Sequence, residues 1–170
     1  MNCKAVEREE DIETLLNLLI YFYGIHARQA INYLDLSSVK FCYSRSTGRL
    51  RSIVQGSEEL AFIRPSDFRL IPRIAMAMIL QKVLPYPKSR VVVINEIVDD
   101  ILEGHTVFSK HVIGGDPAIR PGDEVLIVNE EDKLIGVGRA LISFEAMITA
   151  FMGPAVQIRE KVRKDEKKGI

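Results

Sequence analysis

Two prolines in three positions, Pro85 and Pro87, separate two stretches of very different sequence pattern. Proline interrupts a helix and biases the residue before it toward extended backbone, so this point favours an extended connector. Apolar residues recur at helical spacing before the connector, and short β-like segments separated by turns follow it. The sequence therefore predicts two domains and a basic flexible tail, over 1–86, 87–160 and 161–170.

The first domain is predicted to consist of helices packed on a small antiparallel sheet. Apolar residues at steps of three and four indicate a helix over 9–23, closed by Gly24, and a shorter helix over 26–34. A third helix, beginning at Pro72, carries a wide apolar stripe as far as Val83. Between the second and third helices, apolar segments joined by turns predict an antiparallel meander over 39–43, 50–54 and 59–63.

The second domain is predicted to be a small, partly open β-barrel around one helix. That helix would have Asn95 as its N-cap and Gly104 as its closing glycine. Short strands at about ten-residue spacing are typical of such a barrel, and they are expected over 90–93, 106–113, 124–128, 134–140 and 155–159. The fold class predicted for the whole chain is α+β.

Cysteine usage and hydropathy favour a cytoplasmic protein that does not contact a membrane. Cys3 and Cys42 form no CxxC pair and have no histidine at metal-ligand spacing, so we interpret both as free thiols in a reducing compartment. The N-terminus lacks an apolar signal region. The apolar run over residues 18–23 is far shorter than the roughly 20 residues that span a bilayer. No metal and no cofactor are expected.

Catalytic residues are not expected either. His26, His105 and His111 are scattered, and no serine or cysteine stands in a nucleophile context. Asp99 and Asp100 diverge by about 100° on a helix, which is typical of a solvated face and excludes a shared-proton dyad. The chain is therefore predicted not to be an enzyme by itself.

The net charge of zero hides a segregation of charge along the chain. Residues 1–83 carry a net +2, residues 84–157 carry −5, and residues 158–170 carry +3. The basic stretch in the first domain and the basic end of the chain are candidate phosphate-facing surfaces. Secondary RNA contacts are predicted in the first of these, at Arg45, Arg49 and Arg51.

The segment around residues 107–111 carries the flat and cationic side chains that RNA binding needs. Alternation along a strand places Phe108 and Lys110 on one face. If Phe108 fills the barrel, Lys110 is expected at its rim, where it either contacts RNA or is simply a solvated edge charge. His111 is a further candidate contact. Gly114 and Gly115 are interpreted first as turn residues, although their main-chain N–H groups could also meet an RNA phosphate or a base edge.

Basic residues later in the second domain complete the candidate RNA-binding set. Arg120 and Arg139 stand between small or turn-forming neighbours that leave room for a ligand. Arg159 and Lys161 continue the last strand as a basic extension, compatible with phosphate contact or with solubility alone. An RNA-binding barrel would need the acidic residues near 96–103 and 129–132 to face away from the ligand.

The sequence GHTVFSKHVIGGDPAIRPGDEVLIVNEEDKLIGVGRALIS at 104–143, followed by GPAV at 153–156, resembles the PUA domain over about 89–160. This module is named for pseudouridine synthases and archaeosine transglycosylases. The segments upstream are similar to the domain that precedes PUA in archaeosine tRNA-guanine transglycosylase and its archaeosine synthase relative. They are YSRSTGR at 43–49, LAFIRPSD at 60–67 and LPYP at 84–87.

The resemblance implies that this chain corresponds to the C-terminal part of those enzymes, which holds the tRNA. These enzymes carry a zinc-bearing (β/α)₈ catalytic barrel, which takes at least about 200 residues and has no counterpart in this sequence. The family's PUA domain holds the acceptor stem and its single-stranded 3′ end, which points here to Phe108, Lys110, His111, Gly114, Gly115, Arg120 and Arg159. The KHVIGG text at 110–115 departs from the KFV-type pattern. Imidazole in place of an aromatic ring can still stack on a base.

The expected function is binding of tRNA or another structured RNA, as a non-catalytic accessory module of archaeosine-type tRNA modification. A separate tRNA-modifying enzyme would then be a partner. One alternative is a PUA-domain factor in translation initiation or ribosome assembly. Another is a protein-interaction scaffold without RNA binding, to which the zero net charge and the acidic second domain also fit.

Overall fold

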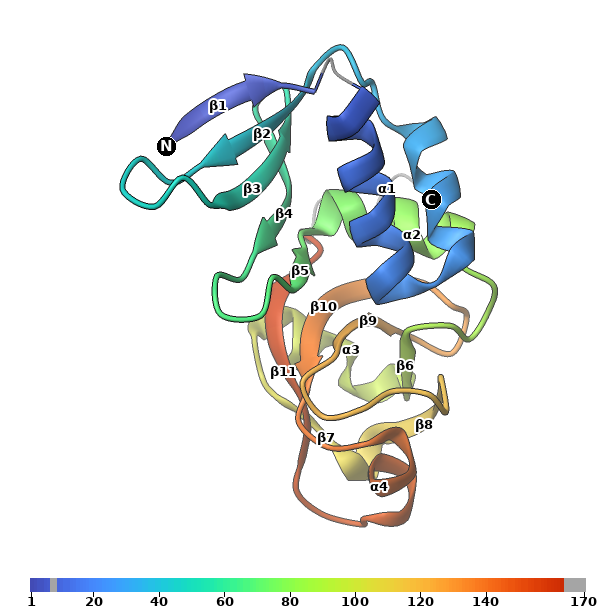
Figure 1. The fold of residues 1–170 in the computed structure, drawn as a ribbon. Coiled ribbons are helices and arrows are strands. Elements are labelled where there is room, and N and C mark those ends of the chain that lie inside the picture. Colours follow the sequence, from blue (N-terminus) through green and yellow to red (C-terminus); the bar gives the residue numbers. More distant parts are fainter. Residues whose placement is uncertain (7–8, 164–170) are drawn as a thin grey trace. The chain divides into compact units, whose positions relative to one another are not determined.

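The computed structural model describes residues 1–6 and 9–163 of the chain. These residues fold into two compact units, divided between Pro85 and Tyr86, each with its own sheet (Figure 1). The tail predicted over 161–170 lies outside the described residues from position 164 onward. The fold class predicted from the sequence, helices on an antiparallel sheet followed by a barrel-like sheet, is confirmed.

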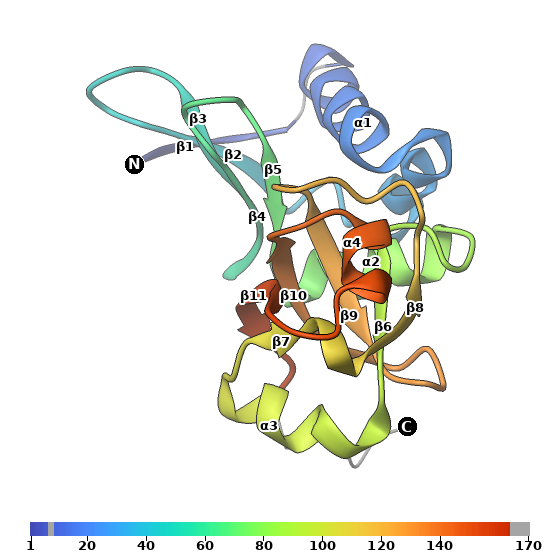
Figure 2. The ribbon, with the colours of Figure 1, turned by 90° about the horizontal axis from the view of Figure 1, so that it is seen from below.

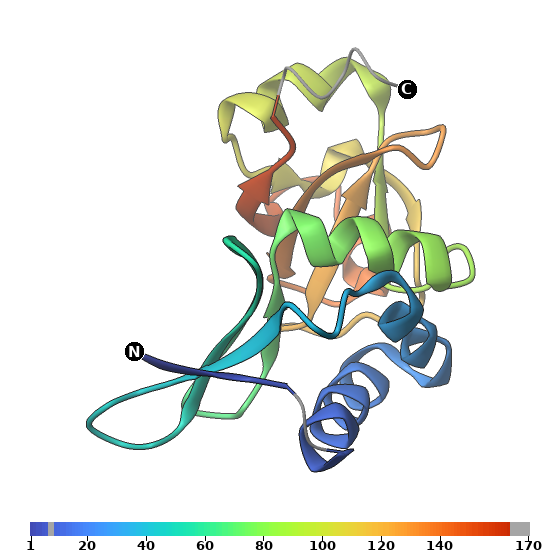
Figure 3. The ribbon, with the colours of Figure 1, turned by 90° about the horizontal axis from the view of Figure 1, so that it is seen from above.

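The first unit contains a five-stranded antiparallel sheet with the strands in chain order. The strands are β1 (Asn2–Ala5), β2 (Val39–Tyr43), β3 (Leu50–Gln55), β4 (Glu58–Ile63) and β5 (Leu70–Pro72). The helices are α1 (Glu9–Tyr23), the 3-10 helix η1 (Ile25–Tyr33) and α2 (Ile74–Val83). Figure 3 shows η1 beside α1 and α2, against which it packs. The predicted helix over 9–23 and the three-strand meander are confirmed.

The last helix of this unit begins later than the sequence predicts. Pro72 ends β5, where it pairs with Ala61, and Arg73 is the extended residue before α2. β5 is the edge strand of the sheet, a position that tolerates a proline because its missing N–H is not needed for a further partner.

The prediction of two free thiols is wrong, because Cys3 and Cys42 form a disulfide. β1 pairs antiparallel with β2, and the register places these two residues directly opposite each other. Their sequence separation of 39 gives no hint of this contact, and the exposed strand that carries Cys3 has no apolar pattern to reveal it. The bond ties the N-terminal edge strand to the sheet.

The second unit is built on a six-stranded, nearly closed mixed sheet in the order β7-β11-β10-β9-β6-β8. The strands are β6 (Arg90–Val93), β7 (Val107–Phe108), β8 (Val112–Gly115), β9 (Glu124–Val128), β10 (Leu134–Ala140) and β11 (Pro154–Lys161). The pair β6–β9 is parallel and the others are antiparallel. Valine, isoleucine and leucine side chains from these strands fill the interior.

Short helices cover this sheet in two places. The 3-10 helix η2 (Asn95–Ile97) leads into α3 (Val98–Glu103), which packs on β10 and β11, whereas α4 (Phe144–Thr149) packs on β8 and on the 3-10 turn η3 (Ser109–His111) (Figure 2). Gly104 closes α3 in the left-handed conformation, as predicted. Asn95 is not an N-cap, because its side chain donates to Glu131.

Two features of the second unit differ from the sequence prediction. The single strand expected over 106–113 is broken by η3 into β7 and β8, so Gly114 and Gly115 belong to a strand and not to a turn. The helix α4 was not predicted, although it has an ordinary start signal. The hydroxyl of Ser143 accepts a hydrogen bond from the main-chain N–H of Ala146 at its N-terminus.

Candidate nucleic-acid interface

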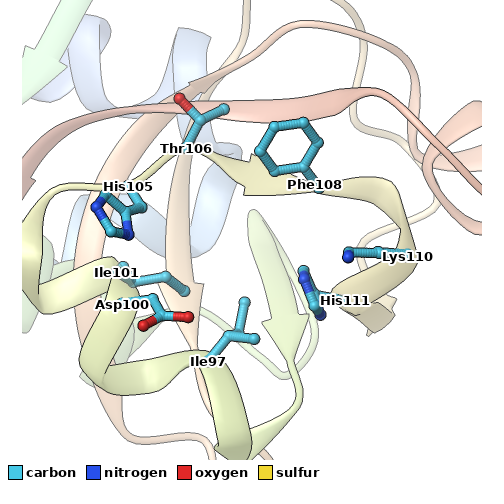
Figure 4. Close-up of a pocket in the computed structure, with 8 residues that line it drawn as sticks. All are labelled: Ile97, Asp100, Ile101, His105, Thr106, Phe108, Lys110 and His111. Carbon is cyan, nitrogen blue, oxygen red and sulfur yellow. The ribbon is translucent and has the colours of Figure 1, made fainter.

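A pocket of about 320 Å³ opens in the second unit between α3 and the β7–η3 segment (Figure 4). Eight residues line it: Ile97, Asp100, Ile101, His105, Thr106, Phe108, Lys110 and His111. Its volume lies at the small end of the range for ligand sites, which suits one base or nucleoside better than a double helix. Three of the residues predicted to contact RNA, Phe108, Lys110 and His111, meet in this pocket.

Long-range backbone contacts fix the wall that carries these three residues. The main-chain N–H of Ser109 donates to the carbonyl of Gly153 at 2.9 Å, and Phe108 is opposite Pro154 on β11. Val107 and Ser109 are buried, which turns Phe108 outward with 43% of its surface exposed. The carbonyl of His111 accepts from Ile94 N–H at 3.1 Å and anchors the other end of the turn. Phe108 therefore does not fill the barrel.

The opposite wall comes from η2 and α3. Ile97, the last residue of η2, and Ile101, in α3, are buried and form the apolar part of the lining. The last turn is closed by main-chain hydrogen bonds from Gly104 and His105 to the carbonyl of Asp100. This closure brings His105 into the pocket lining, where Figure 4 shows it on the same side of the pocket as Ile101 and Asp100.

The pocket has charges of opposite sign on its two sides. Asp100 lies on the α3 side with its carboxylate directed toward the hollow, and Lys110 and His111 lie across from it (Figure 4). For an RNA-binding barrel, the acidic residues of this helix were expected to face away from RNA. Asp100 does not, because it occupies the same wall as Ile97 and Ile101.

Lys161 lies close to the pocket although it is not part of the lining. A Cβ atom built on Gly104 would stand 3.6 Å from the Lys161 ammonium nitrogen, so this charge lies beside the glycine that precedes His105. The last strand thus brings a cation to the α3 side of the pocket from 57 positions further along the chain.

The predicted arginines lie outside the pocket lining, and one of them pairs with the buried carboxylate of Glu124. Arg159 donates from Nε and Nη2 to the two oxygens of Glu124 at 2.9 and 3.0 Å. Arg139 stands opposite Glu124 across β9 and β10, and its guanidinium approaches Gly122. Arg120 is exposed in the same loop, where its main-chain N–H donates to Asp123. These arginines form a group separate from the pocket lining.

The two glycines of β8 differ in what their surroundings demand. A Cβ on Gly115 would stand 2.4 Å from the carbonyl oxygen of Arg90 and 2.9 Å from the ring of Phe144, at a φ of +153°. A Cβ on Gly114 would make ordinary contacts of 3.8 Å with Val92. Close packing therefore accounts for Gly115, and nothing of this kind constrains Gly114.

Asp116 holds the loop after β8 in place. Burial alone would raise the pKa of its carboxyl group. The main-chain N–H groups of Ser89 and Ala118 donate to the carboxylate, and the Lys88 ammonium lies nearby. These contacts outweigh burial and lower the pKa below its ordinary value of 3.8. The ionised carboxylate is thus part of the folded structure between the connector and the sheet.

The proposed secondary contacts lie in the first unit. Arg45 and Arg49 are exposed in the turn between β2 and β3, and Arg51 is half-buried on β3.

Within residues 1–6 and 9–163, no group of three or more histidine, cysteine or acidic residues is placed to hold a metal ion. In the same part of the chain, no helix is both long and apolar enough to cross a membrane.

Five lining residues were not predicted as contacts, namely Ile97, Asp100, Ile101, His105 and Thr106. The i, i+4 spacing of the two isoleucines indicates a buried helix face, and Asp100 directly precedes Ile101. The sequence did not show that this helix lies opposite residues 108–111.

The fold and pocket define a PUA-type protein, and comparison with known families agrees. Residues 89–162 match the PUA domain, and residues 13–87 match the patch-forming domain C2 of tRNA-guanine transglycosylase. The chain thus contains a C2 domain of the tRNA-guanine transglycosylase type followed by a PUA domain, and the resemblance seen in the sequence is confirmed.

Curated relatives share this sequence over nearly all of its length. The tRNA-guanine(15) transglycosylase of Pyrococcus abyssi is 37% identical over 155 residues, which cover 91% of this chain and 26% of the relative. The enzyme of the same name from Methanocaldococcus jannaschii is 36% identical over 150 residues, covering 88% of this chain and 22% of the relative. This chain therefore spans about a quarter of the length of these relatives and corresponds to their C-terminal part.

Solved structures show the same fold. A hypothetical protein from Pyrococcus horikoshii superimposes with a TM-score of 0.70 at 22% identity, over 95% of each chain. A conserved PUA-domain protein from Thermoplasma acidophilum gives a TM-score of 0.55 at 20% identity, over 82% of this chain and 88% of the other.

Proposed function

We propose that this chain binds tRNA and serves as a non-catalytic, RNA-holding module in tRNA modification. The observation that carries the proposal is the pocket in the PUA unit, where an exposed aromatic ring, Phe108, stands beside an exposed lysine, Lys110. An unpaired nucleotide offers the complementary pair of groups, a flat base and a phosphate.

The chemistry of the pocket suits an exposed RNA end. Stacking of one base on an aromatic side chain contributes about 1–3 kcal/mol and works with every base. Lys110 on the same wall can approach the phosphate that follows the stacked base, and the imidazole of His111 adds a second flat surface. Lys161, beside Gly104, extends the cationic contact toward the duplex that would carry the unpaired end.

The relatives support tRNA as the particular RNA. They are named tRNA-guanine(15) transglycosylases, and this chain matches only their C-terminal part. The described residues form two small units, neither of which is a (β/α)₈ barrel. A binding role beside a separate modifying enzyme fits this architecture, with recognition through the shape and backbone of the tRNA.

The proposal is tested by binding of the purified chain to total tRNA, with and without the 3′-terminal CCA, at two salt concentrations. We expect tighter binding to the intact 3′ end and a steep loss of affinity with salt, because phosphate contacts release counterions. Phe108→Ala should weaken binding to intact tRNA about tenfold, and Lys110→Ala should weaken binding and flatten the salt dependence.

A matched control is Lys133→Ala, which removes one positive charge from the β9–β10 turn, outside the pocket lining. It should leave the preference for the CCA end unchanged. Binding of Arg120→Ala to the same tRNA measures whether the arginines outside the pocket contribute to affinity. If tRNA fails to bind at low salt, the RNA-binding role is wrong and the protein-interaction scaffold takes its place. If Lys110→Ala binds like the Lys133→Ala control, the pocket is not the site.

A further inference from the structure

The Asp100 carboxylate limits how a nucleotide can lie in the pocket. It points into the hollow from the α3 side, while Lys110 stands on the far side (Figure 4). A phosphate next to a carboxylate is repelled, so the phosphate belongs near Lys110 and the base belongs near Asp100. The charge division therefore orients the ligand before any particular base is considered.

Asp100 is fixed in position but available as an acceptor. Its main-chain carbonyl accepts from Gly104 and His105, which locks the last turn of α3. In the described part of the chain its carboxylate takes part in neither an ion pair nor a side-chain hydrogen bond, whereas the carboxylates of Asp116 and Glu124 in the same unit are both engaged. Asp100 itself is exposed, and the buried Ile97 and Ile101 beside it give the pocket an apolar surface against which a base can lie.

A carboxylate discriminates between bases because it only accepts hydrogen bonds. Adenine, cytosine and guanine each present an exocyclic amino group that can donate to it. Uracil presents carbonyl oxygens on both sides of its single ring N–H, and these are repelled by the negative charge. An ionised aspartate in a base pocket therefore favours amino-bearing bases over uracil.

We propose that Asp100 is a specificity-determining residue, which makes this pocket select an unpaired nucleotide whose base carries an exocyclic amino group. The inference rests on the proposed RNA-binding function and names the chemical class of nucleotide that the site takes. Phe108 stacks on the base, Asp100 accepts from its amino group, and Lys110 contacts the phosphate. His105, which lines the same side of the pocket, can donate to a ring nitrogen or carbonyl of the same base.

The test uses three versions of one RNA hairpin with the same stem: blunt, with a 3′ overhang CCA, and with a 3′ overhang UUU. We expect the wild-type chain to bind the CCA overhang about tenfold more tightly than the UUU overhang. Asp100→Asn replaces the carboxylate by an amide that also donates, so it should reduce this ratio to about one to threefold.

Asp99→Asn is the matched control, because it makes the same charge change on the neighbouring exposed residue, which does not line the pocket. Loss of one negative charge should raise the affinity of Asp99→Asn for all three hairpins alike, whereas Asp100→Asn should gain affinity for the blunt and UUU hairpins but not for the CCA hairpin, because it also loses the acceptor for the amino group. Only Asp100→Asn should change the ratio between the two overhangs. Circular dichroism of both variants verifies that α3 and the fold are intact.

The possible results separate the two proposals. If the wild-type chain binds both overhangs no better than the blunt hairpin, the pocket does not bind an unpaired end and the proposed function fails. If it binds both overhangs more tightly than the blunt hairpin but equally well, RNA binding stands and selection by Asp100 is refuted. A preference for CCA that Asp100→Asn leaves unchanged also refutes the role of this carboxylate.

Discussion

Removal of the Arg159 side chain should destabilise the second unit. Its guanidinium makes two charge-assisted hydrogen bonds to Glu124, at 2.9 and 3.0 Å, and the Glu124 side chain is only 2% exposed. Arg159→Ala would leave that carboxylate buried with its principal partner removed. Breaking a fully buried ion pair in this way costs about 3–5 kcal/mol.

The expected cost is smaller here, because the Arg159 side chain is 32% exposed and water can reach the site once it is removed. We expect a loss of about 2–3 kcal/mol in the free energy of unfolding. For a cooperative unit of about 85 residues, this lowers the melting temperature by roughly 10–20 °C.

Thermal unfolding followed by circular dichroism measures this loss in Arg159→Ala, Glu124→Gln and the double variant. The double variant should be more stable than Arg159→Ala, because a neutral amide is less costly to bury than an unpaired carboxylate. Lys161→Ala, an exposed position on the same strand, is the control and should melt within about 2 °C of the wild type. If Arg159→Ala also melts within that range, the ion pair is not stabilising and the reasoning fails. Arg159 would then be better explained by its predicted contact with RNA.

Two further predictions concern the segment after η3. Gly115→Ala should cost about 2–4 kcal/mol in urea unfolding, because its Cβ would collide with the Arg90 carbonyl, whereas Gly114→Ala should be nearly neutral; equal stability of the two variants would contradict the packing argument. Because the folded state holds the pKa of Asp116 below 3.8, its ionised form stabilises the fold; that contribution is complete above the unfolded-state pKa and is lost as the pH falls through the folded-state value. Urea unfolding between pH 7 and about pH 3 should therefore show a fall in stability below about pH 4 that is shallower in Asp116→Asn, and an identical fall in both proteins would exclude Asp116 as its source.

Elements with a strong apolar pattern were predictable from the sequence, and exposed or interrupted ones were not. The strands over 124–128 and 134–140 were predicted with the bounds that the structure shows, because nearly every residue in them is buried. β1 is exposed along almost its whole length and β5 has three residues, so neither leaves a pattern. The break at η3 depends on the hydrogen bond between Ser109 and Gly153, which local alternation cannot reveal.

The same distinction applies to the candidate site. Phe108, Lys110 and His111 are close in sequence, so a local pattern was enough to group them. Asp100 and Lys161 come to the site through the packing of α3 and the path of β11, which depend on contacts far apart in the chain. For Arg159, the sequence indicated a cation on the last strand, but its acidic partner lies 35 positions earlier.

The acidity of the second unit does not by itself oppose RNA binding. Its segment 84–157 carries a net charge of −5, but several of its carboxylates are engaged inside the unit. Glu124 pairs with Arg159, Asp116 with Lys88, and Asp132 with Arg90, while Glu130 and Glu131 accept hydrogen bonds from Asn95.

Exposed charges act over a Debye length of about 8–10 Å at physiological salt, so the field that an RNA end meets is set by the charges beside the pocket. The charged residues that line or border the pocket are Lys110, Lys161 and Asp100, with Asp99 and Glu103 nearby on the same helix. Two cations can hold the phosphates while a single carboxylate faces the base, and for a base with an amino group that carboxylate is an attractive contact. The negative charge that appears unfavourable in the sequence is then, at this one position, a means of choosing the nucleotide.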